Sequence, residues 1–183
     1  MNRLLAIALA SMFGQHVVST VGRNVPPVVA PAILADIGLP AASFGVFIAV
    51  LSFASIFFQV GCGAFMSRYG GMRMNQVSLL LLVVGLLVAV PVGFGGEAAA
   101  LALFALAAVL IGGGGALATP ANSHVLGRHA PPRLAPLLFS LKQTGAPLGF
   151  MAVGLAGPWL VGMFGWRGAC VAFALLCAAG ALA

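Results

Sequence analysis

The sequence has almost no acidic residues, since Asp36 and Glu97 are the only two among 183 residues. Charged residues of both signs make up 5% of the chain. A soluble domain carries roughly 25%, so this chain has too little charge to cover a surface that faces water. Both acidic residues also lie outside the long apolar stretches. The sequence therefore predicts a protein of the lipid bilayer without the intramembrane carboxylate that usually carries protons.

Several chemical signatures are also missing. Cys62, Cys170 and Cys177 lie in apolar stretches and form no CxxC pair, which favours packing over zinc binding or redox chemistry. No GxSxG or HExxH motif points to an intramembrane enzyme. The eight basic residues are scattered and form no stripe that could follow nucleic-acid phosphates. We therefore expect no enzyme activity, no metal, no cofactor and no nucleic-acid partner.

Apolar residues make up 62% of the chain and are gathered in long blocks. A helix of about 20 apolar residues crosses the ~30 Å hydrocarbon core of a bilayer. The blocks predict six transmembrane helices at residues 4–34, 43–66, 74–92, 98–118, 137–161 and 169–183. We expect an all-α integral membrane protein, a six-helix bundle that forms a single transmembrane domain over residues 1–183.

The first and last blocks have unusual lengths. At about 1.5 Å per residue the first would measure ~46 Å, so it must tilt, kink or break, most simply near Gly22–Asn24 or Pro26–Pro27. The last would span only ~22 Å, less than the hydrocarbon core. From this short block we expect the chain to be part of a longer protein.

A run of four glycines, Gly112–Gly115, lies inside the fourth block. A phosphate-binding loop would continue with Lys and Ser or Thr, whereas Ala116 and Leu117 follow here. Glycines in a membrane helix allow neighbouring backbones to approach closely. We therefore expect this run to serve helix packing.

The basic residues indicate an orientation. If the N-terminus is cytoplasmic, the alternation of six helices puts five arginines inside, and it puts Arg167 and both acidic residues outside. The inside arginines are Arg3, Arg68, Arg73, Arg128 and Arg133. An excess of basic residues in cytoplasmic loops is typical of membrane proteins. We expect a multi-pass protein of the cell membrane with a cytoplasmic N-terminus.

The connector between the second and third blocks contains a recognisable motif. It reads Gly-Ala-Phe-Met-Ser-Arg-Tyr-Gly-Gly-Met-Arg over residues 63–73 and resembles the major facilitator superfamily signature GxxxDRxGRR. Its glycines and arginines, Gly63, Arg68, Gly70 and Arg73, correspond to those of the signature, and Ser67 stands where the family has aspartate. The resemblance implies a gating loop. Without the carboxylate, Ser67 cannot make the contact to arginine that the family uses to steady one conformational state.

Further segments extend the resemblance along the whole chain. The glycine run, Ser140–Gly149, Gly157-Pro158 and Phe164–Arg167 follow in an order similar to bacterial major facilitator proteins, including cyanate-transporter-like and uncharacterised members. The resemblance implies the N-terminal six-helix half of a transporter in a bacterial inner membrane. It also implies a second six-helix half, in the same chain or a partner chain. Gly157-Pro158 lacks the following Gly-Gly of the family's antiporter motif, so antiport is not implied.

Arg23 is the most informative candidate for a binding site. A charge at the bilayer centre costs ~2.5–3.5 kcal/mol on insertion scales, and such residues usually face the bundle interior or water. Gln15 and Ser19 precede it at intervals of four, with His16 and Thr20 beside them. We predict that Gln15, His16, Ser19 and Arg23 bind the solute, since transporters bind solutes at polar stripes near the midplane. The alternative is that Arg23 snorkels from the end of a shorter helix.

Other polar residues complete the set of candidates. Gln59, with Ser52 and Ser55, could line the same cavity, although hydrogen bonding between helices explains these residues equally well. Lys142 and Gln143 lie near the cytoplasmic end of the fifth block, where Lys142 either contacts the solute or snorkels. Three residues at the end of the fourth block are expected to be capping or loop residues, namely Thr119, Asn122 and His124. His16 could instead relay protons or be a hydrogen-bonded interior residue.

Together these features predict a secondary active or facilitative transporter that moves a small polar solute by alternating access. Two cations and no acids among the intramembrane candidates favour an anionic solute. Coupling groups would then lie in the second half, or transport would be uncoupled or exchange-driven. The alternatives are a truncated, non-transporting membrane interaction protein and, less favoured by the motifs, an intramembrane enzyme.

Overall fold

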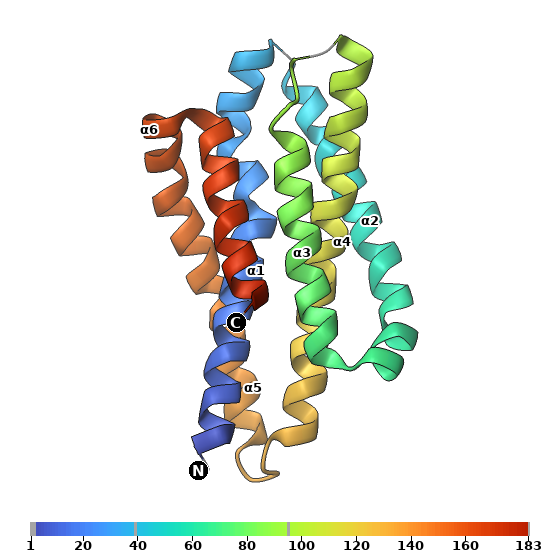
Figure 1. The fold of residues 1–183 in the computed structure, drawn as a ribbon, viewed down its shortest axis with the longest axis vertical. Helices are drawn as coiled ribbons and strands as arrows, with labels where there is room; N and C mark the ends of the chain where they lie inside the picture. The colour runs from blue at the N-terminus through green and yellow to red at the C-terminus, as the bar shows by residue number, and fades with distance from the viewer. Residues whose placement is uncertain (1–2, 39, 95, 183) are drawn as a thin grey trace.

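A computed structural model describes residues 3–38, 40–94 and 96–182, and within these ranges the secondary structure is entirely helical (Figure 1). The helices are α1 (Arg3–Ile37), α2 (Ala41–Tyr69), α3 (Gly71–Ala89), α4 (Glu97–His129), α5 (Ala135–Gln143) and α6 (Gly145–Leu182). Five helical stretches are long and apolar enough to cross a membrane. They are Ala10–Ile37, Ala41–Tyr69, Gly71–Ala89, Ala98–Arg128 and Ala135–Leu182.

The last of these stretches contains a reversal of the chain. Gly165 has φ 69° and ψ 172°, a conformation that side chains with a Cβ rarely adopt, and it interrupts α6. Figure 1 shows α6 running up one side of the bundle, turning at its top and descending beside itself. The predicted helix 137–161 is thus divided between α5 and the first part of α6. The predicted helix 169–183 lies in the second part, except for residue 183, which is outside the described residues.

Two other predicted boundaries are wrong. Of the tilt, kink or break expected in the first block, the break does not occur, because α1 stays helical through Pro26, Pro27 and Pro31. Prolines are tolerated in membrane helices when neighbouring elements enclose them, and α1 packs against α3, α4 and α6. The fourth helix does not end at residue 118 but continues through Pro120 to His129. Smaller shifts affect α2, predicted at 43–66, and α3, predicted at 74–92.

The glycine run of α4 brings three other helices close. Successive helix positions point about 100° apart, so four consecutive glycines face different neighbours. A Cβ added to Gly113 would meet the Phe58 ring of α2 at 2.9 Å, and one on Gly114 would meet the Ser78 carbonyl oxygen of α3 at 2.8 Å. Gly112 faces the Leu51 backbone of α2, and Gly115 faces α1. The predicted packing role of this run is confirmed.

Serine hydroxyls reinforce these contacts. Ser78 Oγ donates to the Gly114 carbonyl at 2.6 Å, and Ser55 Oγ lies 3.0 Å from the Gly112 carbonyl. Both bonds cross between helices at points where no Cβ holds the backbones apart. Close approach and side-chain hydrogen bonding are the main forces that hold helices together in lipid.

The two ends of the bundle differ in charge. Figure 1 places the N-terminus and the α2–α3 and α4–α5 connections at one end, and the α1–α2 and α3–α4 connections with the α6 reversal at the other. The first end therefore carries the basic connector residues Arg68, Arg73, Arg128 and Arg133. The asymmetry expected from the sequence exists in the fold.

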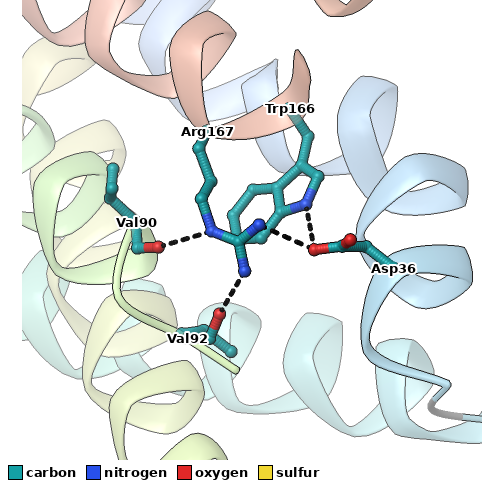
Figure 2. Close-up of polar contacts among 5 residues, drawn as sticks. All are labelled: Asp36, Val90, Val92, Trp166 and Arg167. Carbon is teal, nitrogen blue, oxygen red and sulfur yellow. Dashed lines mark hydrogen bonds and ion pairs between the residues drawn. The ribbon is translucent and has the colours of Figure 1, made fainter. Parts of the chain in front are cut away.

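At the opposite end, Arg167 fastens three parts of the chain together (Figure 2). Its guanidinium pairs with Asp36 of α1 at 2.7 Å and donates to the carbonyl oxygens of Val90 and Val92, at 3.2 and 3.1 Å. The neighbouring Trp166 Nε1 donates to the same Asp36 oxygen at 3.0 Å. We call these five residues the Arg167 clamp. The planar fork of arginine allows it to serve several acceptors at once, so the clamp joins α1, the segment after α3, and α6.

Arg167→Ala should lower the thermal midpoint of the detergent-solubilised protein by roughly 3–6 °C, the range expected for several lost hydrogen bonds in a chain of this size. Asp36→Asn should lower it less, because the amide keeps an acceptor for Trp166 while the two carbonyls keep their donor. Arg133→Ala, an exposed site at the other end, is the control. An unchanged midpoint in Arg167→Ala would contradict a stabilising role for the clamp.

Candidate functional site

A cavity of about 480 Å³ lies between α1, α4, α5 and α6. Its lining residues are His16, Ser19, Thr20, Arg23 and Asn24 from α1, Gly115, Ala118 and Thr119 from α4, and Gln143, Ala146 and Phe150 from α5 and α6. The α1 wall is polar, whereas the wall made by α4 and α6 is largely apolar. A second hollow of about 290 Å³, between α2, α3 and α4, is lined by apolar side chains apart from the Cys62 thiol.

Arg23 is the charged group of the larger cavity. Its Nη2 donates to Ser55 Oγ of α2 at 3.4 Å, and its aliphatic stem lies on Gly115. Among the described residues, Ser55 is its one hydrogen-bond partner, although a guanidinium has five N–H donors. Asp36 lies 13 positions further along the same helix, ~20 Å away, and is paired with Arg167. Asp36 therefore does not neutralise Arg23.

The remaining α1 residues of the cavity hydrogen-bond to their own helix. Ser19 Oγ and Thr20 Oγ1 both donate to the His16 carbonyl at 2.9 Å, and Asn24 Nδ2 donates to the Thr20 carbonyl at 2.7 Å. Each of these side chains still has an oxygen that can accept a hydrogen bond. Placing His16, Ser19 and Arg23 on one cavity wall agrees with the polar stripe expected from the sequence.

Gln15 is not at this cavity. It is buried between α1, α3 and α6, where it hydrogen-bonds with Asn75 and donates to the Gly180 carbonyl at 3.4 Å. The reason is geometric, since positions eight apart on a helix differ by ~80° in direction. Gln15 and Arg23 therefore belong to different faces. Asn75 is the second residue of the predicted helix 74–92 and stands directly before Gln76, so nothing in the sequence alone relates it to Gln15.

Lys142 does not snorkel and is not on the cavity wall. It is 6% exposed, and its Nζ donates to the Thr119 carbonyl at 3.1 Å and to Ser123 Oγ at 2.7 Å. These bonds fasten α5 to the distal part of α4. The adjacent Gln143 does line the cavity.

Residues expected to cap α4 are instead inside it, because the helix runs on to His129. Asn122 is buried, and its Nδ2 lies 3.5 Å from His16 Nδ1. Gln59 and Ser52 are exposed on the outer face of α2, while Ser55 on the same helix is buried beside Arg23. The second-helix serines and glutamine therefore do not share one cavity wall.

The α2–α3 connector is a tight turn at Gly70. This glycine has φ 80°, a conformation that glycine adopts readily, and its N–H bonds to the Met66 carbonyl at 2.9 Å. Ser67 Oγ donates to the Ala64 carbonyl of its own helix at 2.8 Å, and the Arg68 guanidinium lies 5.5 Å from the Tyr69 ring centre. Gly63 and Arg73 are exposed. The serine that replaces the family aspartate is thus turned toward its own backbone.

No three His, Cys, Asp or Glu side chains come together as metal ligands would in the part of the chain that the structure describes. The arrangement offers instead one cation, several hydroxyl and amide groups, and an apolar wall. Such groups can hydrogen-bond a small polar solute.

The apolar helices and the buried polar cavity define a multi-pass membrane protein. A profile of the Major Facilitator Superfamily matches residues 11–183, and the chain belongs to this family. Membership implies transmembrane transport and confirms the family suggested by the α2–α3 connector. It selects no subfamily, so the cyanate-transporter-like assignment gains no support. No curated protein matches the chain.

The contact between Gly115 and Arg23 can be tested directly. A Cβ at residue 115 would lie 2.5 Å from Arg23 Cδ and 3.0 Å from its Cβ, so Gly115→Ala should displace the arginine and cost about 1–3 kcal/mol of stability. Gly154→Ala is the matched control, since nothing lies within 4 Å of that site. Thermal unfolding measures both. If the loss is unchanged when Arg23→Ala is also present, the clash is not with Arg23.

Proposed function

We propose that this chain forms part of a secondary active or facilitative transporter that moves a small polar, anionic solute by alternating access. The observation that carries the proposal is Arg23, a half-buried cation at a cavity, with one serine as its described hydrogen-bond partner. Intramembrane charges are expensive and usually mark solute or ion pathways. A bound anion would neutralise Arg23 and accept its remaining N–H donors.

We propose that the six predicted spans are realised by counting α6 as two helices, 145–164 with α5 ahead of it and 166–182. A second six-helix half, in the same chain or in a partner chain, would complete the transporter. The outward side of α2 supports this, because Phe53, Phe57 and Val60 are all more than 70% exposed and need lipid or protein to cover them.

We propose that the basic end of the bundle faces the cytoplasm, as the positive-inside rule requires, in a bacterial inner membrane. The loop formed by Gly63, Ser67, Arg68, Gly70 and Arg73 would then be a cytoplasmic gate. The close approach of Gly71 to α4 supports this, since a Cβ at residue 71 would lie 2.8 Å from the Ala121 carbonyl oxygen, so the loop packs directly on α4. Coupling to an ion would depend on groups in the second half, and without them transport would be facilitative or an exchange.

Arg23→Ala should reduce transport by about 10- to 100-fold, because a hydrogen bond to a charged group contributes ~1.5–3 kcal/mol. Arg23→Lys should keep part of the activity, since it keeps the charge but loses the planar fork. The measurement is uptake of labelled carboxylates, sulfonates and neutral analogues by proteoliposomes that contain the full-length protein. Arg128→Ala, an exposed arginine at the basic end, should be silent.

Full transport by Arg23→Ala would mean that Arg23 is a snorkelling anchor, and the anionic solute would be abandoned. Absence of flux for every compound in the native protein would favour the alternative, a membrane interaction protein that does not transport.

Orientation is tested by labelling single cysteines in cells with an impermeant thiol reagent. In a background where the three native cysteines are replaced, Glu97→Cys should react from outside and Arg128→Cys only after the membrane is permeabilised. Reaction at position 128 but not at position 97 in intact cells would reverse the proposed topology.

A further inference from the structure

We propose that the solute is a small organic monoanion with a hydrocarbon body, bound with its charged end at Arg23 and its body against Phe150. The inference rests on the proposed function, in which Arg23 binds an anion, and it adds the class of anion. It follows from three properties of the cavity, which are its single cation, its apolar wall and its size.

The cavity offers one positive charge. Lys142, the other intramembrane cation of the described residues, already donates to Thr119 and Ser123 of α4 and does not line the cavity. His16 Nδ1 lies 3.5 Å from the Asn122 amide nitrogen. One guanidinium neutralises one carboxylate or sulfonate. A dianion would bring a second charge into the membrane without a partner.

The cavity also has apolar surface. Ala118 of α4 and Ala146 and Phe150 of α6 carry no hydrogen-bonding side-chain atoms, while Thr119 of α4 and Gln143 of α5 add one hydroxyl and one amide. A solute that is polar on all sides, such as a sugar or a polycarboxylate, would leave groups unpaired against Ala118, Ala146 and Phe150. A solute with an apolar body would bury that body on the Phe150 ring, and aromatic side chains contribute a large apolar contact area.

The size of the cavity also favours an organic anion. A volume of about 480 Å³ is within the ~300–1,000 Å³ range typical of sites for organic ligands. A halide or small inorganic oxyanion would contact Arg23 and leave the apolar wall unoccupied. Thr20 and Asn24 lie with Arg23 on the α1 side of the same cavity, and Ala118, Ala146 and Phe150 supply its apolar surface.

The experiment compares four probes on the purified full-length protein at constant ionic strength, with thermal stabilisation as the measure of binding. Benzoate has one charge and an apolar ring, formate has the charge alone, benzamide has the ring without the charge, and terephthalate has the ring with two charges. Benzoate should stabilise the protein at a concentration about tenfold or more below that of each other probe.

Variants assign the effect to the cavity. Phe150→Ala should weaken benzoate by about tenfold while leaving formate unchanged, whereas Leu155→Ala, which is also on α6 but does not line the cavity, should alter neither. Arg23→Gln should abolish stabilisation by benzoate. Arg23→Lys, which keeps the charge, should retain part of the stabilisation by benzoate. It is the control for a loss that is caused by poor folding of Arg23→Gln.

The outcomes separate the two proposals. Equal stabilisation by formate and benzoate, both lost in Arg23→Gln, would overturn the organic-monoanion inference and leave the anion transporter standing. Stronger stabilisation by terephthalate would overturn it as well. Benzoate stabilisation that persists in Arg23→Gln and Arg23→Lys alike would remove Arg23 as the anion site, and with it the proposed function. No stabilisation by benzoate at millimolar concentration would overturn the inference.

Discussion

The close approach of α4 to its neighbours is the constraint on which the rest of this structure depends. Four consecutive glycines remove the side chains that would hold α1, α2 and α3 away, so the helices meet through backbone and through serine hydroxyls. The same absence of side chains makes room for Arg23, whose stem lies on Gly115. A larger residue at any of these positions would affect packing first and the cavity next. Packing and site therefore share one short segment of sequence.

Charge is distributed so that the middle of the bundle is left unbalanced. Asp36 is used at one end, in the Arg167 clamp, and Glu97 begins α4 at that same end. Arginines occupy the connectors of the other end. Between them, Lys142 donates to two α4 oxygens, while the described residues give Arg23 one hydrogen-bond partner, Ser55. Charges inside a membrane usually mark solute or ion pathways, and the chain belongs to a family whose members transport solutes.

The sequence predicted the helices well and their contacts poorly, for a physical reason. The length of an apolar block reflects the thickness of the bilayer, and this constraint does not depend on which helices pack against it. Helix ends and facing directions depend on partners far along the chain. The sequence predicts Asn122 as a capping or loop residue, but α4 continues past it and places it beside His16. The sequence predicts Gln15 on the same face as Arg23, but Gln15 pairs with Asn75, which lies 60 positions away in the chain. Arg23 stands out in the sequence because a lone charge in an apolar block is costly wherever it points, and the structure places it at the cavity.

The reversal at Gly165 has a consequence for how the protein is assembled. With a single glycine between them, the two parts of α6 have no loop that could cross to the far side separately, so they must enter the bilayer as a hairpin. Trp166 and Arg167 stand directly after that reversal, and their partners Asp36, Val90 and Val92 come earlier in the chain. During synthesis the clamp can close only after this hairpin reaches a bundle that already contains α1 and α3. Its formation therefore marks the completion of this helical unit.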